Sequence, residues 1–217
     1  TQPDQVKELS NLFSDYSVFF GPAYDIKREN SEVREQYGNL ILSKFPVLSS
    51  FNHILPQTVN SSFRQMPRQL SEITIKTPLF SLCIMTTHLE FHSEFQRCEQ
   101  VRRIVSINQE INNLVTMPPL FDNNGSYRKF ERSDRVILCG DFNNTAFSWV
   151  YKKLKDDKND AFVDAGSGFS KSYDYKFPAR IDFIFSDKSF VINNFKTFDV
   201  AYSDHYPIMA RFDLSKK

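Results

Sequence analysis

The sequence is poor in cysteine, and the three cysteines that it has lie far apart. Cys83, Cys98 and Cys139 form no closely spaced pair, and their number is odd. A disulfide framework needs paired cysteines and a cysteine-based zinc site needs neighbouring ones, so the pattern argues against both. We expect three reduced thiols.

The chain also lacks an excess of either charge. Lysine and arginine total 27, and aspartate and glutamate total 26. No overall field would therefore draw the protein to DNA or to an acidic membrane, and contact with nucleic acid would need a local basic patch. The near-zero net charge argues against a nonspecific, processive nuclease, which binds the nucleic acid along a basic surface.

Long apolar runs are absent as well. No stretch of about 18 apolar residues could span a membrane as a helix, and no charged segment followed by an apolar one opens the chain as a secretion signal would. We find no internal repeat and no low-complexity segment. Two compartments stay open: the cytoplasm, or a membrane reached through an anchor upstream of Thr1. We expect a monomer.

What the sequence does have is an aromatic, alternating pattern typical of one folded domain over residues 1–217. Hydrophobic residues make up 41%, with 22 phenylalanines and 9 tyrosines. The pattern predicts helices near residues 1–13, over 97–115 and after Asn144, the first capped by Thr1 with Asp4 and the last by Thr145. It predicts strands over residues 17–20, 37–43, 70–75, 79–88, 136–139, 180–186 and 208–214. Residues 51–69, 117–134 and 160–175 read as loops.

Polar clusters stand where these predicted strands begin or end. Asp141 and Asn143 follow an apolar run, and they would point to one side if the strand continued through them. Taken singly, each cluster is ordinary turn or cap chemistry. Together they are better explained by one site, whose candidates are His88, Glu90, Asp141, Asn143, Asp182, Asp204 and His205. Oxygen donors and imidazoles without a cysteine favour magnesium, manganese or calcium over zinc, and they suit chemistry at phosphorus.

Five segments carry a resemblance to a known family. They are residues 37–46 (YGNLILSKFP), 86–90 (TTHLE), 140–143 (GDFN), 180–184 (RIDFI) and 203–207 (SDHYP). In this order they resemble the successive motifs of the endonuclease/exonuclease/phosphatase superfamily. The resemblance implies an α+β fold, a four-layer α/β/β/α sandwich of two mostly antiparallel sheets between helices. It also implies metal-dependent hydrolysis of a phosphate ester.

The resemblance further implies roles for individual residues. Asp204 would help to hold the metal, which we expect to be Mg²⁺, with Mn²⁺ or Ca²⁺ as alternatives. Asp141 and Asn143 would orient or deprotonate the attacking water. His205, paired with Asp182, would act on the phosphoryl group, and His88 would donate to a phosphate oxygen or assist the leaving group.

One departure from the family pattern concerns the start of the chain. Members open with a strand that bears an asparagine and then a strand that ends in Gln-Glu, whose glutamate is the main metal ligand. Neither motif is in this sequence, and Glu90 does not match that ligand. We therefore interpret the 217 residues as a domain truncated at its N-terminus, and we expect the isolated chain to bind metal poorly and to hydrolyse little.

The substrate is open at this stage. A phosphodiester, including nucleic acid, and a phosphomonoester both fit, and Arg64 and Arg68 are candidates to bind phosphate. Two alternatives remain: a noncatalytic binding domain that keeps the fold, and a lipid phosphodiesterase of the sphingomyelinase type.

Overall fold

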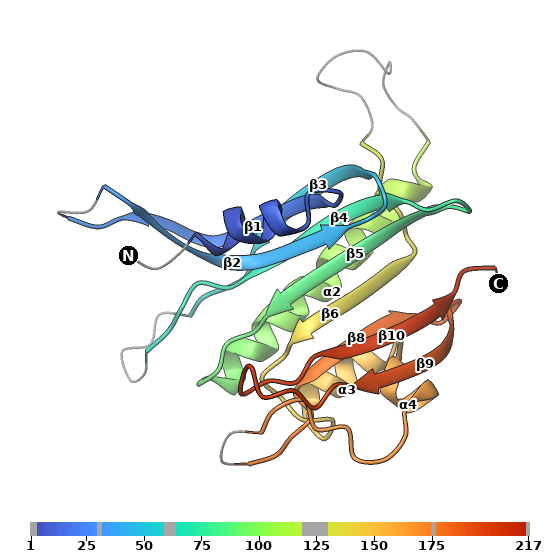
Figure 1. Ribbon diagram of the computed structural model, residues 1–217. Coiled ribbons are helices and arrows are strands. Elements are labelled where there is room, and N and C mark those ends of the chain that lie inside the picture. Colours follow the sequence, from blue (N-terminus) through green and yellow to red (C-terminus); the bar gives the residue numbers. More distant parts are fainter. Residues whose placement is uncertain (1–3, 30–31, 59–63, 119–129, 175–176, 216–217) are drawn as a thin grey trace.

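The computed structural model describes residues 4–29, 32–58, 64–118, 130–174 and 177–215. Its helices are α1 (Gln5–Leu12), α2 (Glu94–Thr116), α3 (Trp149–Lys155) and α4 (Ala161–Ala165) (Figure 1). Its strands are β1 (Ser17–Lys27), β2 (Arg34–Ser43), β3 (Val47–Ile54), β4 (Gln69–Lys76), β5 (Ser81–His88), β6 (Val136–Asp141), β7 (Lys158–Asp160), β8 (Asp182–Asp187), β9 (Val191–Thr197) and β10 (Ile208–Asp213).

A six-stranded sheet in the order β3-β4-β5-β6-β8-β7 forms the centre of the molecule. Its pairs are antiparallel except for β5 with β6, which is parallel. The predicted strands over residues 70–75 and 79–88 are confirmed as β4 and β5, which form an antiparallel hairpin. β4 is buried over Gln69–Ile75 and β6 over Val136–Leu138, as expected for the interior of a sheet.

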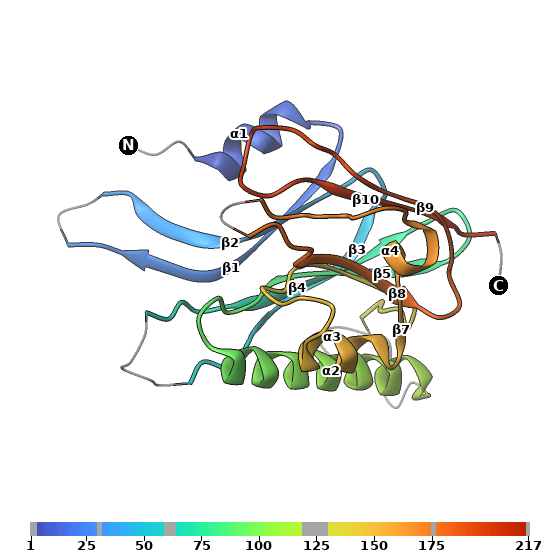
Figure 2. The same ribbon diagram turned by 90° about the horizontal axis from the view of Figure 1, so that it is seen from below.

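The second strand layer consists of two separate hairpins, β1 with β2 and β9 with β10. They lie on one side of the six-stranded sheet, and α2 and α3 lie on its other side, while α1 lies outside the hairpins (Figure 2). This arrangement confirms the predicted α/β/β/α layers. The second layer is divided, however, where a single sheet was expected.

Two apolar clusters hold the layers together. The larger packs β4, β5, β6 and β8 against α2 and α3, and includes Met85, Ile104, Leu138 and Phe183. The smaller lies between the strand layers and contains Ile73, Ile137 and Phe190 with half-buried neighbours. The six-stranded sheet is therefore covered more completely on the face that packs against the helices than on the face that packs against the hairpins.

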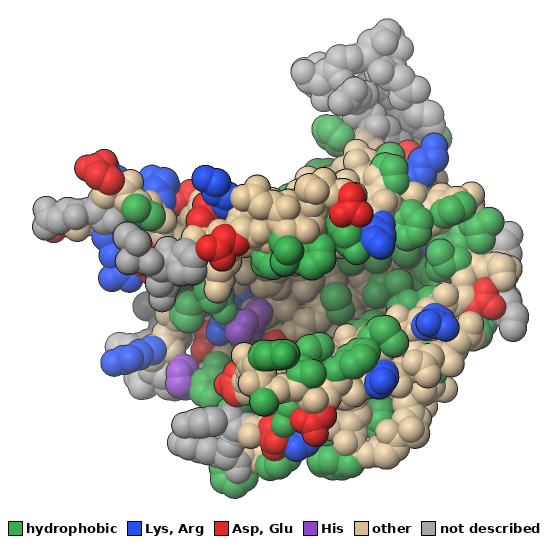
Figure 3. Space-filling model, viewed as in Figure 1, with side chains coloured by type: hydrophobic (Ala, Val, Ile, Leu, Met, Phe, Trp, Pro, Cys, Tyr) green, Lys and Arg blue, Asp and Glu red, His purple; other side chains and the backbone are tan. Residues whose placement is uncertain are grey.

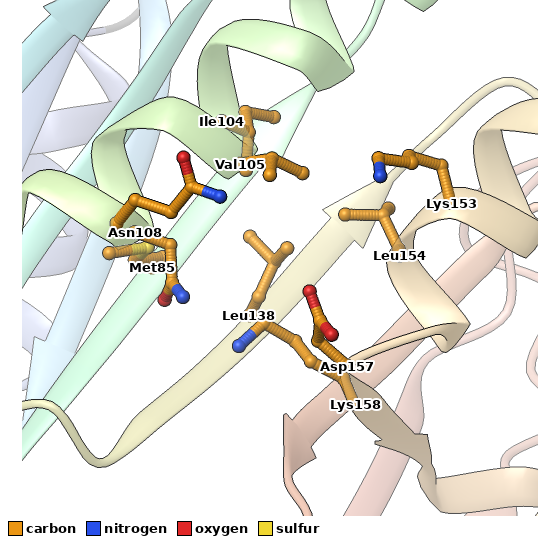
Figure 4. Close-up of a pocket in the computed structure, with 10 residues that line it drawn as sticks. Met85, Ile104, Val105, Asn108, Leu138, Lys153, Leu154, Asp157 and Lys158 are labelled. Carbon is orange, nitrogen blue, oxygen red and sulfur yellow. The ribbon is translucent and has the colours of Figure 1, made fainter. Parts of the chain in front are cut away.

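A small cavity lies on that helical side, between α2, α3 and the sheet. It has a volume of about 30 Å³ and is lined by Met85, Asn108, Leu138 and Lys158, among others (Figure 4). That volume holds about one water molecule. It is a packing gap on the face of the sheet away from the polar clusters, and it is no candidate for a substrate site.

Several predicted elements need correction. Residues 51–54, at the start of the stretch expected to be loop, belong to edge strand β3, because strand pairing with β4 compensates for its polar side chains. β9 has no counterpart in the prediction, and residues 161–165, expected to be loop, form α4. β1 and β2 are longer than the strands predicted over residues 17–20 and 37–43.

The helix starts also differ from expectation. Asp4 is the N-cap of α1 and accepts from the Lys7 amide, while the predicted Thr1 cap lies outside the described residues. Ser148, and not Thr145, caps α3, so the helix begins after Phe147 and leaves that side chain 88% exposed. Among the described helices, none combines the length and apolarity needed to cross a membrane.

Candidate active site

Three of the candidate residues stand side by side at one rim of the six-stranded sheet. His88 pairs with Asp141 across β5 and β6, and Asp141 pairs with Asp182 across β6 and β8. Each residue occupies the end of its strand that faces this rim, so the sheet register itself gathers them. The positions of the strand ends in the sequence suggested that these residues share a rim. The pairing of the strands gives their order along it.

Gly140 makes the close approach at this rim feasible. Its φ is +145°, and a Cβ built there would lie 1.9 Å from the Thr87 carbonyl oxygen. A side chain at this position would push β6 away from β5 and displace the neighbouring Asp141. The glycine is therefore required by the geometry of the site as well as by the turn.

His205 enters the rim from the second strand layer, just before β10. Its Nδ1 lies 2.9 Å from Oδ2 of Asp182, and its Nε2 lies 3.9 Å from Oδ2 of Asp141. One ligand atom from each of Asp141, Asp182 and His205 lies within 4.8 Å of the others, a grouping that could hold a metal ion. The Tyr173 ring packs against the His205 imidazole, with centroids 5.0 Å apart. These contacts fix the imidazole between the two carboxylates.

His88 approaches Asp141 from the other side. Its Nε2 lies 3.3 Å from Oδ2 of Asp141, and its Nδ1 lies 3.0 Å from the Tyr37 hydroxyl on β2. Arg68 in turn donates from Nη1 to that hydroxyl at 3.2 Å. The Asp141 carboxylate is thus flanked by two imidazoles, and a buried guanidinium lies one tyrosine farther away.

The buried setting shifts the acid–base properties of these groups. Burial, together with the charge of Asp182, raises the pKa of Asp141 to about 6. Burial also raises the pKa of Asp182. Burial and the positive charges of Arg68 and His205 lower the pKa of His88 to about 4, so this imidazole is neutral at neutral pH. Perturbed pKa values of this kind cluster at functional sites.

Asn143 occupies a different position from the one predicted. β6 ends at Asp141, and Asn143 has φ +49°, so the two side chains do not follow strand alternation. The Asn143 amide nitrogen Nδ2 donates to the Leu89 carbonyl, and its backbone N–H donates to Oδ1 of Asp141. Asn143 therefore ties the loops after β5 and β6 together and holds the Asp141 carboxylate in place.

The four remaining candidates lie at different depths. Arg68 is buried, with Nε 4.0 Å from Oε2 of buried Glu90. Arg64 is exposed on the connection between β3 and β4. The Asp204 carboxylate is exposed, accepts from the Ser203 hydroxyl and stands outside the Asp141, Asp182 and His205 grouping. Its metal-binding role stays a prediction.

Two supporting residues were not assigned by sequence reasoning. Tyr37 was part of a recognised motif, but its contact with His88 joins two layers and leaves no trace in local periodicity. Ser172 is fully buried, and its hydroxyl accepts from the backbone N–H groups of Ile181 and Asp182. It fixes the start of β8, and with it the position of Asp182.

Replacing Asp141 by asparagine is expected to stabilise the fold while it damages the site. The folded state holds the Asp141 proton more tightly than the unfolded state, so the wild-type carboxyl group lowers stability as pH rises from about 4 to about 6. The variant should gain on the order of 2 kcal/mol in the free energy of unfolding at about pH 7.5, and nothing at about pH 3. Urea unfolding in EDTA measures both; an equal gain at both pH values would contradict the assignment.

The model of the Endonuclease/Exonuclease/phosphatase family matches residues 1–205. No curated protein matches the sequence.

Solved structures share the fold at low identity. A Bacteroides thetaiotaomicron mannosyl-6-phosphatase is 16% identical, with a TM-score of 0.70, over 97% of this chain and 81% of its own. An endonuclease/exonuclease/phosphatase from Bacteroides vulgatus is 19% identical, with a TM-score of 0.71, over 97% and 81%. The catalytic domain of human nocturnin, with bound sulfate, is 19% identical, with a TM-score of 0.65, over 98% and 76%. With its family model matched over most of its length, the chain belongs to the endonuclease/exonuclease/phosphatase family.

Proposed function

We propose that the protein is a divalent-metal-dependent phosphoesterase that cleaves its substrate by attack of an activated water at phosphorus. The observation that carries the proposal is the convergence of two imidazoles on one carboxylate: Nε2 of His88 and Nε2 of His205 lie 3.3 and 3.9 Å from Oδ2 of Asp141. Family membership supports a phosphoesterase.

In this proposal Asp141 accepts the proton of the attacking water. Its pKa of about 6 leaves it ionised at neutral pH and basic enough for general-base work. His205 donates from Nδ1 to Asp182, which fixes the orientation of the imidazole, so Nε2 faces the rim. From there the imidazole can contact the phosphoryl oxygens, on which negative charge builds up in the transition state.

His88 would have a different task, since its low pKa keeps it neutral. Its Nδ1 is held by the Tyr37 hydroxyl, which leaves Nε2 directed toward Asp141 and the rim. A neutral imidazole can donate one hydrogen bond to a phosphate oxygen without adding charge. His88 therefore orients the substrate in this scheme.

The residues fit a divalent cation as well. Asp141 and Asp182 offer hard oxygen donors close to the His205 imidazole, a grouping that could hold such an ion. Asp204, on the same loop as His205, is the further ligand that we predict. When bound, the ion would neutralise charge on the phosphoryl oxygens; Mg²⁺ is our proposal for its identity.

The substrate class that we propose is a phosphodiester, with a phosphomonoester as the alternative. Nocturnin and the mannosyl-6-phosphatase, whose fold the chain shares, are consistent with a site that works on phosphate. Exposed Arg64 would be available to meet phosphate, and we propose it as a substrate contact. Buried Arg68 would act through Tyr37 and His88.

The test is hydrolysis of bis-p-nitrophenyl phosphate by the full-length protein, with p-nitrophenyl phosphate measured in parallel. We expect turnover that EDTA abolishes and that added Mg²⁺ or Mn²⁺ restores, because the cation neutralises the phosphoryl charge. A higher kcat/KM for the first substrate would favour a phosphodiesterase. Turnover that survives complete chelation would overturn metal dependence, and no turnover of either ester with any divalent ion would favour a noncatalytic binding domain.

A further inference from the structure

Tyr37 connects the hairpin of β1 and β2 to the rim of the six-stranded sheet. Its hydroxyl lies 3.0 Å from Nδ1 of His88, at the end of β5. Asn39, on the same strand as Tyr37, donates to the Thr86 hydroxyl at 3.3 Å, so β2 is held against β5 at this point. Since Nε2 of His88 faces Asp141, the two ring nitrogens have different neighbours, a hydroxyl at Nδ1 and a carboxylate at Nε2.

The partners of the Tyr37 hydroxyl determine the direction of its hydrogen bonds. A tyrosine hydroxyl has one proton to donate and lone pairs that accept, whereas an arginine side chain only donates. Nη1 of Arg68 lies 3.2 Å from the hydroxyl oxygen, so the oxygen accepts from Arg68. Within the described part of the chain, the other hydrogen-bond partner of this hydroxyl is Nδ1 of His88. The Tyr37 proton therefore points to Nδ1.

A hydrogen bond accepted at Nδ1 places the proton of a neutral imidazole on Nε2. The neighbour on the other side of the ring favours the same tautomer, because Nε2 of His88 lies 3.3 Å from Oδ2 of Asp141. In the opposite tautomer, a ring lone pair would face the Asp141 carboxylate, and the Tyr37 proton would lose its acceptor. Both neighbours thus select the tautomer with Nε2–H.

Arg68 is held firmly enough to set this direction. Its side chain is 6% exposed, and its Nε lies 4.0 Å from Oε2 of Glu90. Its backbone carbonyl accepts from the Leu55 amide, and its guanidinium carbon lies 5.8 Å from the centre of the Tyr37 ring. A guanidinium does not lose its proton in proteins, so Arg68 cannot become an acceptor and reverse the chain of hydrogen bonds.

The other end of this chain of hydrogen bonds is open to solvent. The His88 side chain is 33% exposed, in contrast to that of Arg68. In Figure 3, histidine side chains are visible at the end of the hollow between the half that carries β1 and β2 and the half that carries β10. A substrate oxygen that enters there would meet Nε2–H as a hydrogen-bond donor.

We propose that Tyr37 and Arg68 are positioning residues, which hold the His88 ring with its Nε2 proton directed at the rim. The contribution of His88 to turnover rests on the proposed function, whereas the position of its proton does not. With Nε2 protonated, His88 cannot accept the proton of the attacking water, which leaves Asp141 to do so. A neutral imidazole that gave up this proton would become an imidazolate. His88 therefore donates a hydrogen bond to a phosphate oxygen and does not protonate the leaving group.

Nuclear magnetic resonance of the 217-residue chain with ¹⁵N-labelled histidine tests the position of the proton. Spectra are recorded in EDTA at about pH 8, where an ordinary histidine is neutral, and the His88 signals are those that His88→Gln removes. We expect a protonated Nε2 and an unprotonated Nδ1 that accepts a hydrogen bond. Tyr37→Phe should move the Nδ1 signal because that hydrogen bond is lost. A proton on Nδ1 of the wild type would overturn the proposal.

Tyr24→Phe provides the matched control for these spectra. The Tyr24 ring stacks on the Tyr37 ring with centroids 5.9 Å apart, and its hydroxyl donates to Glu35 instead of a histidine. The same loss of a hydroxyl there should leave the His88 signals unchanged. Equal changes in the two variants, or a Nδ1 signal that Tyr37→Phe does not move, would also overturn the proposal.

A double-mutant cycle in the full-length protein tests the contribution to turnover. With bis-p-nitrophenyl phosphate, Tyr37→Phe should lower kcat about tenfold, as expected for one lost hydrogen bond that orients a side chain. In a His88→Gln background the same substitution should lower kcat by less than about twofold, because Tyr37 acts through His88. An equal loss in both backgrounds would show that Tyr37 acts through overall stability, and would overturn its positioning role. Wild-type kcat in His88→Gln would overturn the role of His88 in the proposed function, while the spectra decide separately where its proton lies.

Discussion

The His205→Ala variant of the full-length protein is expected to hydrolyse bis-p-nitrophenyl phosphate about 10²- to 10⁴-fold more slowly than the wild type, in kcat. The substitution removes the imidazole that lies between Asp182 and Asp141, and with it the ring nitrogen Nε2 directed at the rim. KM should change less than kcat, because the lost interaction is stronger in the transition state than with bound substrate.

A substitution of a histidine outside the site provides the control for this experiment. His53 on β3 bonds buried Glu72 through Nε2 at 2.7 Å and belongs to a different cluster. His53→Gln keeps a donor there and should retain kcat within about twofold, as expected for a substitution away from the site. Equal losses in the two variants would show that His205 acts through overall stability, and an unchanged kcat in His205→Ala would remove it from the mechanism.

The Arg68→Met variant is expected to lose about 3–5 kcal/mol in the free energy of unfolding. Arg68 and Glu90 are both almost completely buried, and Nε of the guanidinium lies 4.0 Å from Oε2 of Glu90. Without Arg68, a buried negative charge is left uncompensated. Urea unfolding of the 217-residue chain measures the change.

Two further variants show whether charge compensation is the cause. Arg68→Met combined with Glu90→Gln should recover most of the loss, since no unpaired charge remains. Arg64→Met, the same change at the exposed arginine of the same connection, should alter stability by no more than about 0.5 kcal/mol. A double variant as unstable as the single one would contradict the ion pair.

The fold was predictable from sequence where side-chain patterns are determined by burial. The alternation in β4 and the apolar run of β6 identified those strands, because their side chains pack on both faces. β3 and β9 escaped prediction. β3 is an edge strand rich in serine and asparagine, and in β9 only Phe195 is buried, so their pairing is set by neighbouring strands and hardly by their own composition.

The site likewise has residues that the sequence patterns predicted and contacts that they did not. Strand ends indicated that His88, Asp141, Asp182 and His205 share a rim, and the structure brings these four together. The contact of His88 with Tyr37, and of Tyr37 with Arg68, depends on how the two strand layers stack, which no local pattern encodes. Asn143 was predicted by strand alternation that stops two residues earlier, at the end of β6.

Hydrolysis in ¹⁸O-labelled water tests the central claim, that the rim activates water for attack at phosphorus. Full-length protein turns over bis-p-nitrophenyl phosphate with Mg²⁺, and the products are analysed by mass spectrometry. The account predicts one labelled oxygen in the p-nitrophenyl phosphate product and none in nitrophenol, because the bond formed is between water oxygen and phosphorus. Label in nitrophenol, or no turnover with any divalent ion, would contradict it.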